Sequence, residues 1–474
     1  MWDCAARWMG GWSVDVLTLS ARADIPVAGV RLGTDLNFFE HISWLPHFWC
    51  DAGWYQQMLL VGLFVAAAGL ALGCRPKPCL CVCWLLVISL HTRNPFILYG
   101  GDHVLRLLLF WLVLLPWSPQ LSQRAVFFSP HEVRQVFSPG LVAQMLMIYV
   151  FTALHKSGSD WRVDATALQH ALSIQSLRTW IGDIVHGSSP PWLLSLGTHA
   201  GLMIEEFGPL AIACLSKAQT PRTLLVLIMM AFHLSLALLF KLAFFQAVMI
   251  VLWCAFLPPG FWQFWLASRN RCLVTDQPSH RFPAAWKLLV VAALVSYCLA
   301  WNISTLPLAA TSTVPSCLQA PGYLLRIDQH WGLFSPNVQT EDGWLFLEGE
   351  TPDGRRAAIN GYADSLVQPG AMQDLRHAYR SRFWREYHMT LYHARYEPAI
   401  ADYAQWITKR WNTRHPDQHL RDVKLYFMRV NSRYSSRKIQ RIQIYPPQSV
   451  TPQGTAVFEQ IVPWTIHYAN LHSL

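Results

Sequence analysis

The stretch GLVAQMLMIYVFTALHKSGSDW, from Gly140 to Trp161, determines how the rest of the chain is interpreted. A helix that crosses a bilayer needs roughly 20 mostly apolar residues, and the run from Gly140 to Leu154 comes close to that length. His155 and Lys156 follow where such a helix ends. The pattern predicts a membrane helix with a polar end. Lys156 is either a charge that marks the end of the span or an amine that takes part in chemistry.

Similar apolar runs recur along the chain. Of its 474 residues, 53% are hydrophobic and only 14% are charged, and its 23 Trp exceed what a soluble enzyme usually contains. The fold class that we predict is an α-helical integral membrane bundle of about eight transmembrane helices, followed by a small extracytoplasmic α+β domain. Besides the helix of the first stretch, the predicted helices are Tyr55–Gly73, Cys79–Leu90, Val104–Leu115, Leu193–Cys214, Thr223–Leu239, Leu242–Leu257 and Ala284–Leu306.

Lys and Arg are unevenly distributed between the two alternating sets of short loops. Ten lie in one set, which includes Arg75 and Lys77, and five lie in the other, which includes Lys156 and Lys241. Because cytoplasmic loops carry the excess of positive charge, the first set is predicted to face the cytoplasm. The part of the chain after Leu306 then lies outside, in a periplasm or a lumen.

Three regions follow from these patterns. Residues 1–54 are rich in Trp and Phe and are interrupted by charges, which predicts an amphipathic segment at one membrane interface rather than a signal peptide. Residues 55–310 are expected to form the transmembrane domain and residues 311–474 the α+β domain. In the latter, the predicted strands are Trp344–Glu348, Val423–Val430 and Lys438–Tyr445, TPDGRR (351–356) predicts a hairpin turn, and apolar residues recur at helical spacing around Tyr387 and Ile407.

The net charge of +9 is spread over the loops and the C-terminal part, without a basic cluster interleaved with aromatic residues. Nucleic acid is therefore not an expected partner, whereas the lipid bilayer is. Cys79, Cys81 and Cys83 form a Cys-x-Cys-x-Cys run whose spacing fits no common zinc site, so packing is its expected role and no metal is expected. Cys50 and Cys317 both fall on the outer side, where oxidising conditions allow a disulfide between them.

Polar residues gather on the predicted outer face of the membrane domain. The first outer loop runs from Arg93 to Arg106 and the second from His155 to Arg162; the third holds Lys241, and RIDQHWGLFSPN follows the last helix. Ionisable residues are costly at membrane depth and tend to mark functional sites. The convergence of these four groups on one face is therefore the strongest indication of function in the sequence.

Lys156 has two interpretations. A Lys at a helix end often extends its ammonium into water while its stem is buried. The polar stretch after it could instead fold over the helix end, and burial would then favour a neutral amine that acts as a base. His155 could share that role or pair with a carboxylate. Glu205 and Glu206 lie within an apolar run, so at least one of them is expected to pair or be protonated, in the site or in a purely structural pair with His or Arg. His233 in another run is either structural or part of the site, and Asp102 is expected as a helix N-cap.

Four stretches together resemble a known family. NPFILYGGDHVLRLLLFWLVLLP (94–116), YVFTALHKSGSDWRVDATALQHALS (149–173), FHLSLALLF (232–240) and DQHWGLFSPNVQTEDGW (328–344) are similar to motifs of the vitamin K-dependent gamma-carboxylase family and its bacterial relatives, the HTTM (horizontally transferred transmembrane) proteins. The resemblance implies a membrane enzyme that deprotonates a reduced vitamin K or menaquinol-type hydroquinone and lets O2 react with it. The strong base so formed removes a γ-proton from peptidyl glutamate, to which CO2 adds.

The resemblance also implies roles for individual residues. Lys156 matches the lysine that serves as the base for the hydroquinone, His155 stands beside it, and His233 matches a histidine near the site. The implied partner is a secreted or periplasmic peptide or protein that bears glutamate. The residues for which cofactor contacts are implied are Asn94, Tyr99, Asp102, Trp161 and Glu205.

This sequence departs from the family in three ways. Pro95 stands where the carboxylases carry a histidine before the LYG turn, the chain is shorter than the animal carboxylases, and the N-terminus offers no clear helix before Tyr55. Two alternatives therefore stay open. One is a related quinol-dependent oxidoreductase or peptide-maturation enzyme, and the other is a non-catalytic membrane binding protein.

Overall fold

The computed structural model of the chain describes residues 45–50, 52–115, 138–215, 218–258, 260–262, 285–307, 314–362, 365–368, 375, 378–379, 381–395, 397–432 and 439–446. Most of the predicted interfacial segment, residues 1–54, lies outside the described residues. Cys50, one half of the expected disulfide, is a free thiol. The side chain of Cys317, its expected partner, lies outside the described part of the chain.

Each predicted apolar stretch forms a helix. Three of these helices, α4, α13 and α16, are long enough and apolar enough to cross a membrane. α14 has 10 residues, so it rises about 15 Å, half of the roughly 30 Å hydrocarbon core. The helices are α4 (Gly53–Ala71), α5 (Pro76–Arg93), α6 (Gly100–Leu114), α8 (Ser138–His155), α12 (Pro191–Cys214), α13 (Gln219–Leu239), α14 (Phe245–Cys254) and α16 (Ala285–Ser304).

The start of α14 differs from the prediction. We expected a helix from Leu242, but Ala243 has a φ of 47°, in the left-handed region that ends a regular helix. The N–H of Lys241 donates to the carbonyl of Leu177 at 2.6 Å, and the N–H of Thr179 donates to Leu239 at 3.1 Å. The chain between α13 and α14 is thus held by another segment instead of continuing as a helix.

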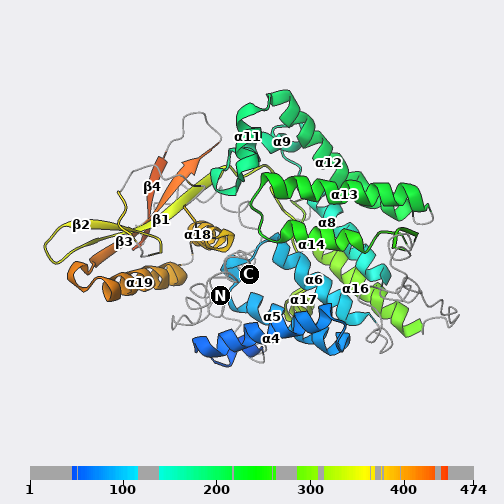
Figure 1. Cartoon of the computed structure of the whole chain (residues 1–474), viewed down its shortest axis with the longest axis horizontal. Coiled ribbons are helices and arrows are strands. Elements are labelled where there is room, and N and C mark those ends of the chain that lie inside the picture. Colours follow the sequence, from blue (N-terminus) through cyan, green and yellow to red (C-terminus); the bar gives the residue numbers. More distant parts are fainter. Residues whose placement is uncertain are drawn as a thin grey trace.

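Short helices connect α8 to α12. They are α9 (Ser159–Arg162), α10 (Ala167–Ser173), the 3-10 turn η3 (Gln175–Leu177) and α11 (Trp180–Ser188). Figure 1 shows α9 and α11 above α12 and α13, at one end of the helical part. The remaining helical elements of this part are η1 (Pro46–Phe48), η2 (Pro95–Ile97) and α17 (Ser316–Leu325).

The C-terminal part contains a four-stranded antiparallel sheet in the order β2-β1-β3-β4. All three predicted strands are confirmed, and the predicted hairpin turn joins β1 to β2, with Gly354 at a φ of 76°. β2 was not predicted. The elements are β1 (Glu341–Glu350), β2 (Arg356–Asn360), β3 (Arg421–Asn431), β4 (Ile439–Tyr445), α18 (Arg382–Ala394), α19 (Glu397–Arg414) and η5 (Pro416–Gln418).

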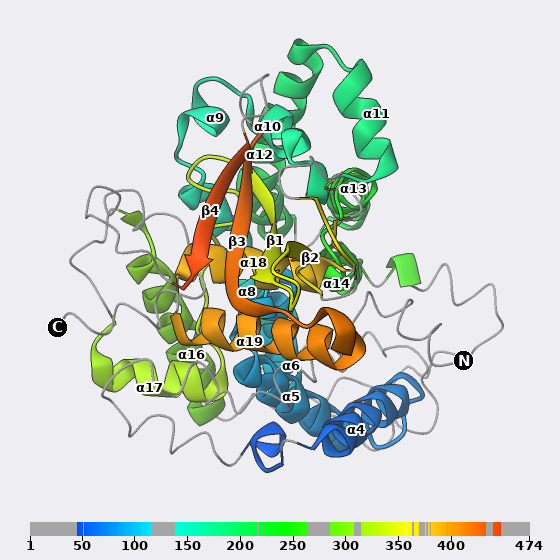
Figure 2. The ribbon, with the colours of Figure 1, turned by 90° about the vertical axis from the view of Figure 1, so that its left-hand side faces the viewer.

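Alternation along the strands places apolar residues on both faces of the sheet. Leu347 and Phe427 pack in one core with the helices α18 and α19, whereas Trp344 and Met428 belong to a core on the other face. Figure 2 shows the sheet in front of α18, and both views place α18 between the sheet and the membrane-type helices. α18 is therefore positioned to contribute to both parts of the molecule.

A buried polar bridge joins the helical part to the sheet. The N–H of Ser176 in η3 donates to Asp342 Oδ2 of β1 at 3.0 Å, and Ser176 Oγ donates to Asp342 Oδ1 at 2.7 Å. Arg385 of α18 donates from Nε to Ser176 Oγ at 2.5 Å, and its Nη2 lies 3.5 Å from Asp342 Oδ1. This bridge fixes α18 against the connecting helices.

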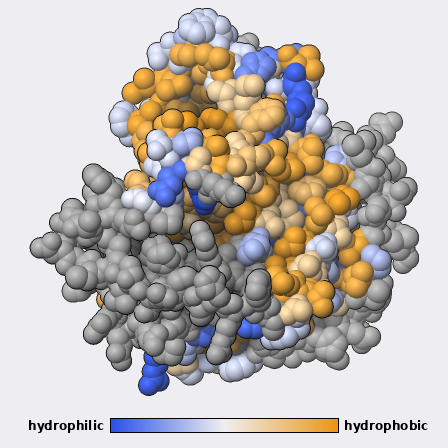
Figure 3. Space-filling model, turned by 90° about the vertical axis from the view of Figure 1, so that its right-hand side faces the viewer, coloured by the Kyte–Doolittle hydropathy of each residue, from blue (hydrophilic) through white to orange (hydrophobic). Residues whose placement is uncertain are grey.

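Large apolar side chains remain exposed on the membrane-type helices. Figure 3 shows apolar surface spread broadly over the side of the molecule toward which α13 and α16 extend. A soluble surface rarely carries so continuous an apolar area, whereas lipid-facing helices do. The exposed side chains include Phe64 of α4, Met203 and Phe207 of α12, Leu224 and Leu234 of α13, and Leu289 of α16.

Candidate functional site

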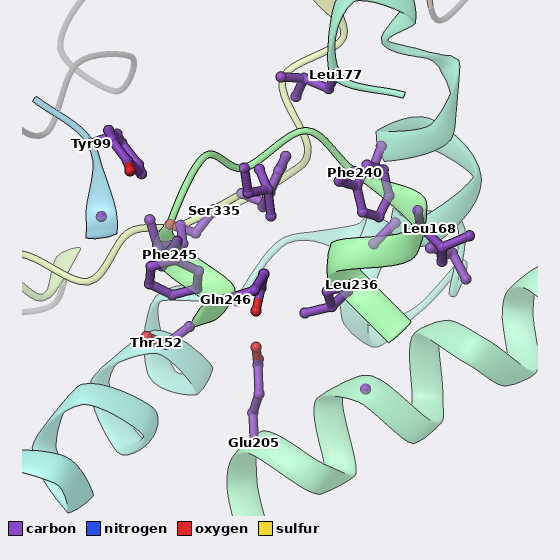
Figure 4. A pocket seen from close by; sticks show the side chains of 18 of the residues that line it. Tyr99, Thr152, Leu168, Leu177, Glu205, Leu236, Phe240, Phe245, Gln246 and Ser335 are labelled. Atoms are coloured by element: carbon purple, nitrogen blue, oxygen red, sulfur yellow. The ribbon is translucent and has the colours of Figure 1, made fainter. Parts of the chain in front are cut away.

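A largely apolar cavity of about 700 Å³ lies among α8, α10, α12, α13, α14 and α18. Most of the side chains in Figure 4 are aliphatic or aromatic, and Leu168, Leu236 and Phe240 lie on the side of the cavity opposite Tyr99 and Phe245. Three of the four predicted outer groups line the cavity, through Tyr99, Lys156 and Ser335. From the fourth group, the neighbour of Lys241, Leu242, lies on the cavity wall. Segments from all four groups thus lie near one cavity, although Lys241 itself does not line it.

Lys156 lies on the wall of this cavity with only 4% of its surface exposed. Its Nζ donates to Glu205 Oε2 of α12 and lies 4.3 Å from the ring centroid of Trp161. The polar stretch after α8 therefore does shield the amine from water, as one of our two interpretations required. The amine is paired with the carboxylate of Glu205, however, so its geometry is not that of an isolated amine.

The turn that carries Lys156 is fixed from one side by Arg162. Arg162 Nε donates to the carbonyl of Lys156 at 3.1 Å, and its Nη2 donates to the carbonyl of Ala153 at 3.0 Å. These bonds satisfy carbonyls that the end of a helix leaves without partners. Arg162 Nη2 also forms a half-exposed ion pair with Glu206 at 2.7 Å. The turn after α8 and the helix α9 are thereby each joined to α12 by one ion pair, of which only the Lys156–Glu205 pair is buried.

The turn is fixed from the other side by the segment Phe334–Val338, which follows the last apolar helix. The N–H of Gly158 donates to the carbonyl of Pro336 at 3.0 Å, and Trp161 Nε1 donates to the carbonyl of Phe334 at 2.8 Å. The N–H of Asp160 donates to Asn337 Oδ1 at 3.0 Å, and Asp160 Oδ2 accepts from the N–H of Val338 at 3.1 Å. We call these contacts the SPN clamp. They bring together two motifs that are far apart in the sequence.

A second polar group lies on the same cavity wall. His233 of α13 is buried between Tyr149 Oη, 2.5 Å from its Nε2, and Gln246 Oε1, 2.6 Å from its Nδ1. Trp253 Nε1 in turn donates to Tyr149 Oη at 2.6 Å. Figure 4 shows the side chains of Gln246 and Glu205 pointing toward one another. Two polar groups thus line the cavity, one at Lys156 and Glu205 and one at Gln246 and His233.

Of the eight predicted site residues, the cavity wall includes Lys156, His233, Tyr99, Trp161 and Glu205. Tyr99 Oη accepts a hydrogen bond from the N–H of Phe244 at 3.1 Å, and burial raises the pKa of this phenol well above its usual range. Tyr99 thus stays protonated at neutral pH. It supplies a neutral hydroxyl group beside the cavity.

His155, Asn94 and Asp102 do not line the cavity. Successive helical residues point about 100° apart, and His155 faces away from Lys156, with its Nε2 3.1 Å from Thr305 Oγ1 and its ring 4.6 Å from that of His330. The structure thus does not place His155 with Lys156 in one site. Asn94 is buried at the end of α5.

Asp102 is not the N-cap that we expected. Tyr99 precedes α6 as its N-cap, and Asp102 is the third helical residue, whose Oδ2 accepts from the Tyr99 N–H at 3.1 Å. This is the carboxylate position of a capping box. Asp102 also pairs with His91 at 3.3 Å. Its role in the structure is to fix the turn that presents Tyr99 to the cavity.

Several cavity residues were not anticipated from the sequence. Tyr149 and Thr152 precede Lys156 at spacings of seven and four, which places all three near one face of α8, and this pattern could have revealed them. Arg382 and Glu386 of α18 form an ion pair on the cavity wall, and burial lowers the pKa of the Arg382 guanidinium to about 10. No local signal connects this distant helix to the cavity.

Comparisons of the chain with protein-family models, with curated proteins and with solved structures gave no match. The function must therefore be inferred from the geometry of the cavity together with the motifs of the sequence.

Proposed function

We propose that the protein is a multi-pass membrane enzyme of the gamma-carboxylase type, which binds a lipid-soluble hydroquinone in the cavity and couples its oxidation by O2 to the carboxylation of peptidyl glutamate. The observation that carries this proposal is the position of Lys156. Its amine is almost fully buried, is paired with Glu205, and lies on the wall of an apolar cavity beside the face of Trp161.

The cavity suits a flat, mostly hydrocarbon ligand. Its volume of about 700 Å³ falls within the usual range of small-molecule sites, which combine an apolar wall with a few polar groups that fix orientation. Gly197 and Gly201 of α12 and Gly100 of α6 keep the wall open. A Cβ at Gly197 would approach Leu168 Cδ2 to 2.7 Å, so any larger side chain there would narrow the space.

A proton can move from Lys156 to Glu205 without a change in the total charge of the pair, and the pair then gains one positive charge when it takes a proton from the ligand. When the ammonium gives its proton to the Glu205 carboxylate, a neutral amine and a neutral acid remain. The amine can then accept a hydroxyl proton from the ligand, after which Glu205 retains one proton and Lys156 is again an ammonium. Once deprotonated and oxidised by O2, the bound hydroquinone supplies the strong base needed for carboxylation. Trp161 stabilises the ammonium through its ring face.

The proposal includes a membrane arrangement. Besides the three helices that meet both criteria for a span, α5, α6, α8, α12 and α14 would complete a bundle of about eight, in which short helices such as α14 cross only part of the bilayer. The distribution of Lys and Arg supports an extracytoplasmic position for the sheet and for the polar ends around the cavity. A secreted glutamate-bearing peptide would reach the cavity from that side.

A second candidate is a quinol-dependent oxidoreductase that uses the same cavity without carboxylation. Pro95 supports it, because this residue stands where the family's carboxylases have a histidine. His155, the histidine nearest to Lys156 in sequence, points away from the cavity. Glu205 is therefore the partner of Lys156 for proton transfer, and neither Pro95 nor His155 takes that role.

The decisive experiment uses purified protein in lipid nanodiscs, supplied anaerobically with vitamin K hydroquinone or menaquinol and then with O2, labelled bicarbonate and a glutamate-rich peptide. We expect label on the peptide, with a loss of at least about 100-fold in Lys156→Met, since general-base catalysis contributes roughly that factor or more. Glu206→Gln, which removes only the half-exposed ion pair, is the matched control. Oxygen consumption without label would select the oxidoreductase, and neither signal would refute both enzymes.

A further inference from the structure

The cavity touches opposite sides of two neighbouring membrane-type helices. Ala231 and His233 of α13 both line it, and so do Thr198 and Ala200 of α12. Successive helical residues point about 100° apart, so the two members of each pair point about 200° apart. A cavity enclosed behind these helices would meet only their inner sides. The cavity therefore continues between α12 and α13 to their outer side.

The outer side that the cavity reaches is apolar. Ala200, Ala231 and Ser235 line the cavity and are exposed, and we call the part that they border the α12–α13 opening. Ser235 Oγ donates to the carbonyl of Phe232 at 2.7 Å, so this hydroxyl is satisfied within its own helix. The exposed large side chains on the same two helices are also apolar, and they include Leu196 and Phe207 of α12 and Leu234 and Leu238 of α13.

The seam between α12 and α13 is tight at one level and looser at the level of the opening. A Cβ on Gly208 would lie 2.6 Å from Met229 Sδ, so the helices are in close contact there. About two turns earlier in α12, the nearest described atom to a Cβ on Gly201 would be Phe232 Cε2, at 3.7 Å. The helices thus separate toward Gly201, where one aromatic ring lies between them.

The part of the cavity that α18 lines has a different character. Arg382, Arg385 and Glu386 lie on that wall, and Arg382 forms an ion pair with Glu386. A hydrocarbon chain placed against these charged groups would remove water from them without supplying a hydrogen bond, which is costly. The α12–α13 opening is therefore the part of the cavity that suits a hydrocarbon chain.

We propose that the ligand carries a long hydrocarbon tail, such as a polyisoprenoid chain, which passes through the α12–α13 opening into the bilayer while the ring stays in the cavity beside Lys156. The inference rests on the proposed function in taking the ring to be a hydroquinone, and it adds the tail, which the chemistry of the ring does not require. Because lipid and the opening are both apolar, the tail needs an unobstructed path and contributes little to the affinity.

The test compares 2-methyl-1,4-naphthohydroquinone, which has no tail, with its 3-octaprenyl derivative under anaerobic conditions in lipid nanodiscs. Affinities are expressed as mole fractions in the lipid, because the tail increases partitioning into the bilayer. Wild-type protein should bind the two compounds with similar affinity. Ala231→Trp fills the opening and should weaken binding of the octaprenyl compound by at least about tenfold, as overpacking does. Binding of the tail-free compound should be unchanged.

Ala237→Trp is the matched control, because Ala237 is an exposed residue of the same helix that does not line the cavity. It should leave the binding of both compounds unchanged. Ala200→Trp obstructs the opening from α12 and replaces Ala231→Trp if that variant does not fold, as judged by its unfolding midpoint.

Two results would overturn this inference alone. One is a wild-type protein that binds only the tail-free compound, and the other is an equal effect of the opening variants on both compounds. Failure of the wild-type protein to bind either hydroquinone would overturn the proposed function as well.

Discussion

Lys156 and Glu205 form an ion pair that has very little contact with water. Their positions could be predicted only in part. The motif around Lys156 indicates a shielded amine, and the position of Glu205 in an apolar helix demands a partner, but nothing in the sequence joins the two. Gln246 was not predicted at all, because one amide in an apolar helix resembles an ordinary polar residue until the hydrogen bonds of His233 are seen.

Removal of one member of this pair should be more harmful to stability than removal of both. Lys156→Met leaves a buried carboxylate without its partner and should lower the free energy of unfolding by about 3 kcal/mol, whereas Lys156→Met with Glu205→Gln should recover most of that loss. Thermal and denaturant unfolding in detergent micelles, followed by intrinsic fluorescence, measures the difference. An additive double variant would show that the two side chains do not interact.

At the scale of elements, the SPN clamp connects the end of α8 to the segment before β1. A Cβ on Gly158 would lie 2.1 Å from Asn337 Oδ1 and 2.6 Å from the carbonyl oxygen of Pro336. Its backbone, with a φ of −75° and a ψ of 166°, suits any residue. Glycine is needed here because of the close approach of the two segments and not because of its conformational freedom.

Gly158→Ala should therefore destabilise the protein by about 1–3 kcal/mol, as overpacked sites do, and weaken hydroquinone binding by displacing the Lys156 turn. Gly187→Ala is the control, since a Cβ at Gly187 in α11 meets nothing within 4 Å and alanine is favoured in helices. Unfolding midpoints and hydroquinone affinities measure both effects. Equal midpoints for the two variants would contradict the close packing of the clamp.

α18 contains a buried histidine that makes stability depend on pH. His388 Nε2 lies 2.6 Å from Tyr403 Oη, and burial lowers the pKa of His388 to about 3. The unfolded chain binds a proton near pH 6.5, so between that pH and about 3 the unfolded state holds more protons, and stability falls as the pH falls. His388 contributes its full stabilisation above about pH 6.5.

Wild-type protein should lose about 2 kcal/mol more stability between pH 6.5 and 5 than His388→Gln does, because each pH unit below the unfolded pKa costs about 1.4 kcal/mol. Unfolding midpoints measured across this range for both proteins test the expectation. Parallel pH profiles would show that His388 is protonated equally in the folded and unfolded states.

The secondary structure could be predicted wherever a regular pattern was long enough. Strands β1, β3 and β4 follow from alternating or β-branched residues, and the apolar helices follow from their composition. β2 was missed because RAAIN carries little of that signal, and α9 to α11 were missed because helices this short show no full period of apolar residues. The predicted start of α14 was wrong because two tertiary hydrogen bonds, from Lys241 to Leu177 and from Thr179 to Leu239, hold the apolar segment before α14 in a non-helical path.

At the scale of the whole molecule, the cavity combines membrane-type helices with α18 from the C-terminal part. Composition and charge predict a membrane protein and the side on which the polar loops gather. They do not predict that residues more than two hundred positions apart share one wall, because such contacts depend on tertiary packing alone. The exposed apolar surface in Figure 3 agrees with the coarse prediction of a membrane environment.

Reporter fusions can establish the sidedness of the molecule. Alkaline phosphatase, which is active only after export, should be active when fused after Tyr445 and inactive when inserted at residues 216–217 between α12 and α13, since the charge bias places that loop in the cytoplasm. A reporter that requires the cytoplasm, such as green fluorescent protein, should give the opposite pattern. Activity of the phosphatase at 216–217 would reverse the proposed topology.

The SPN clamp also sets an order of events during synthesis. α8 leaves the ribosome long before residues 334–338 do, and the residues of α18 emerge later still. Until then the Lys156 turn lacks the segment that holds it, and one side of the cavity is missing. A nascent chain that ends before α18 therefore cannot enclose a ligand in this cavity.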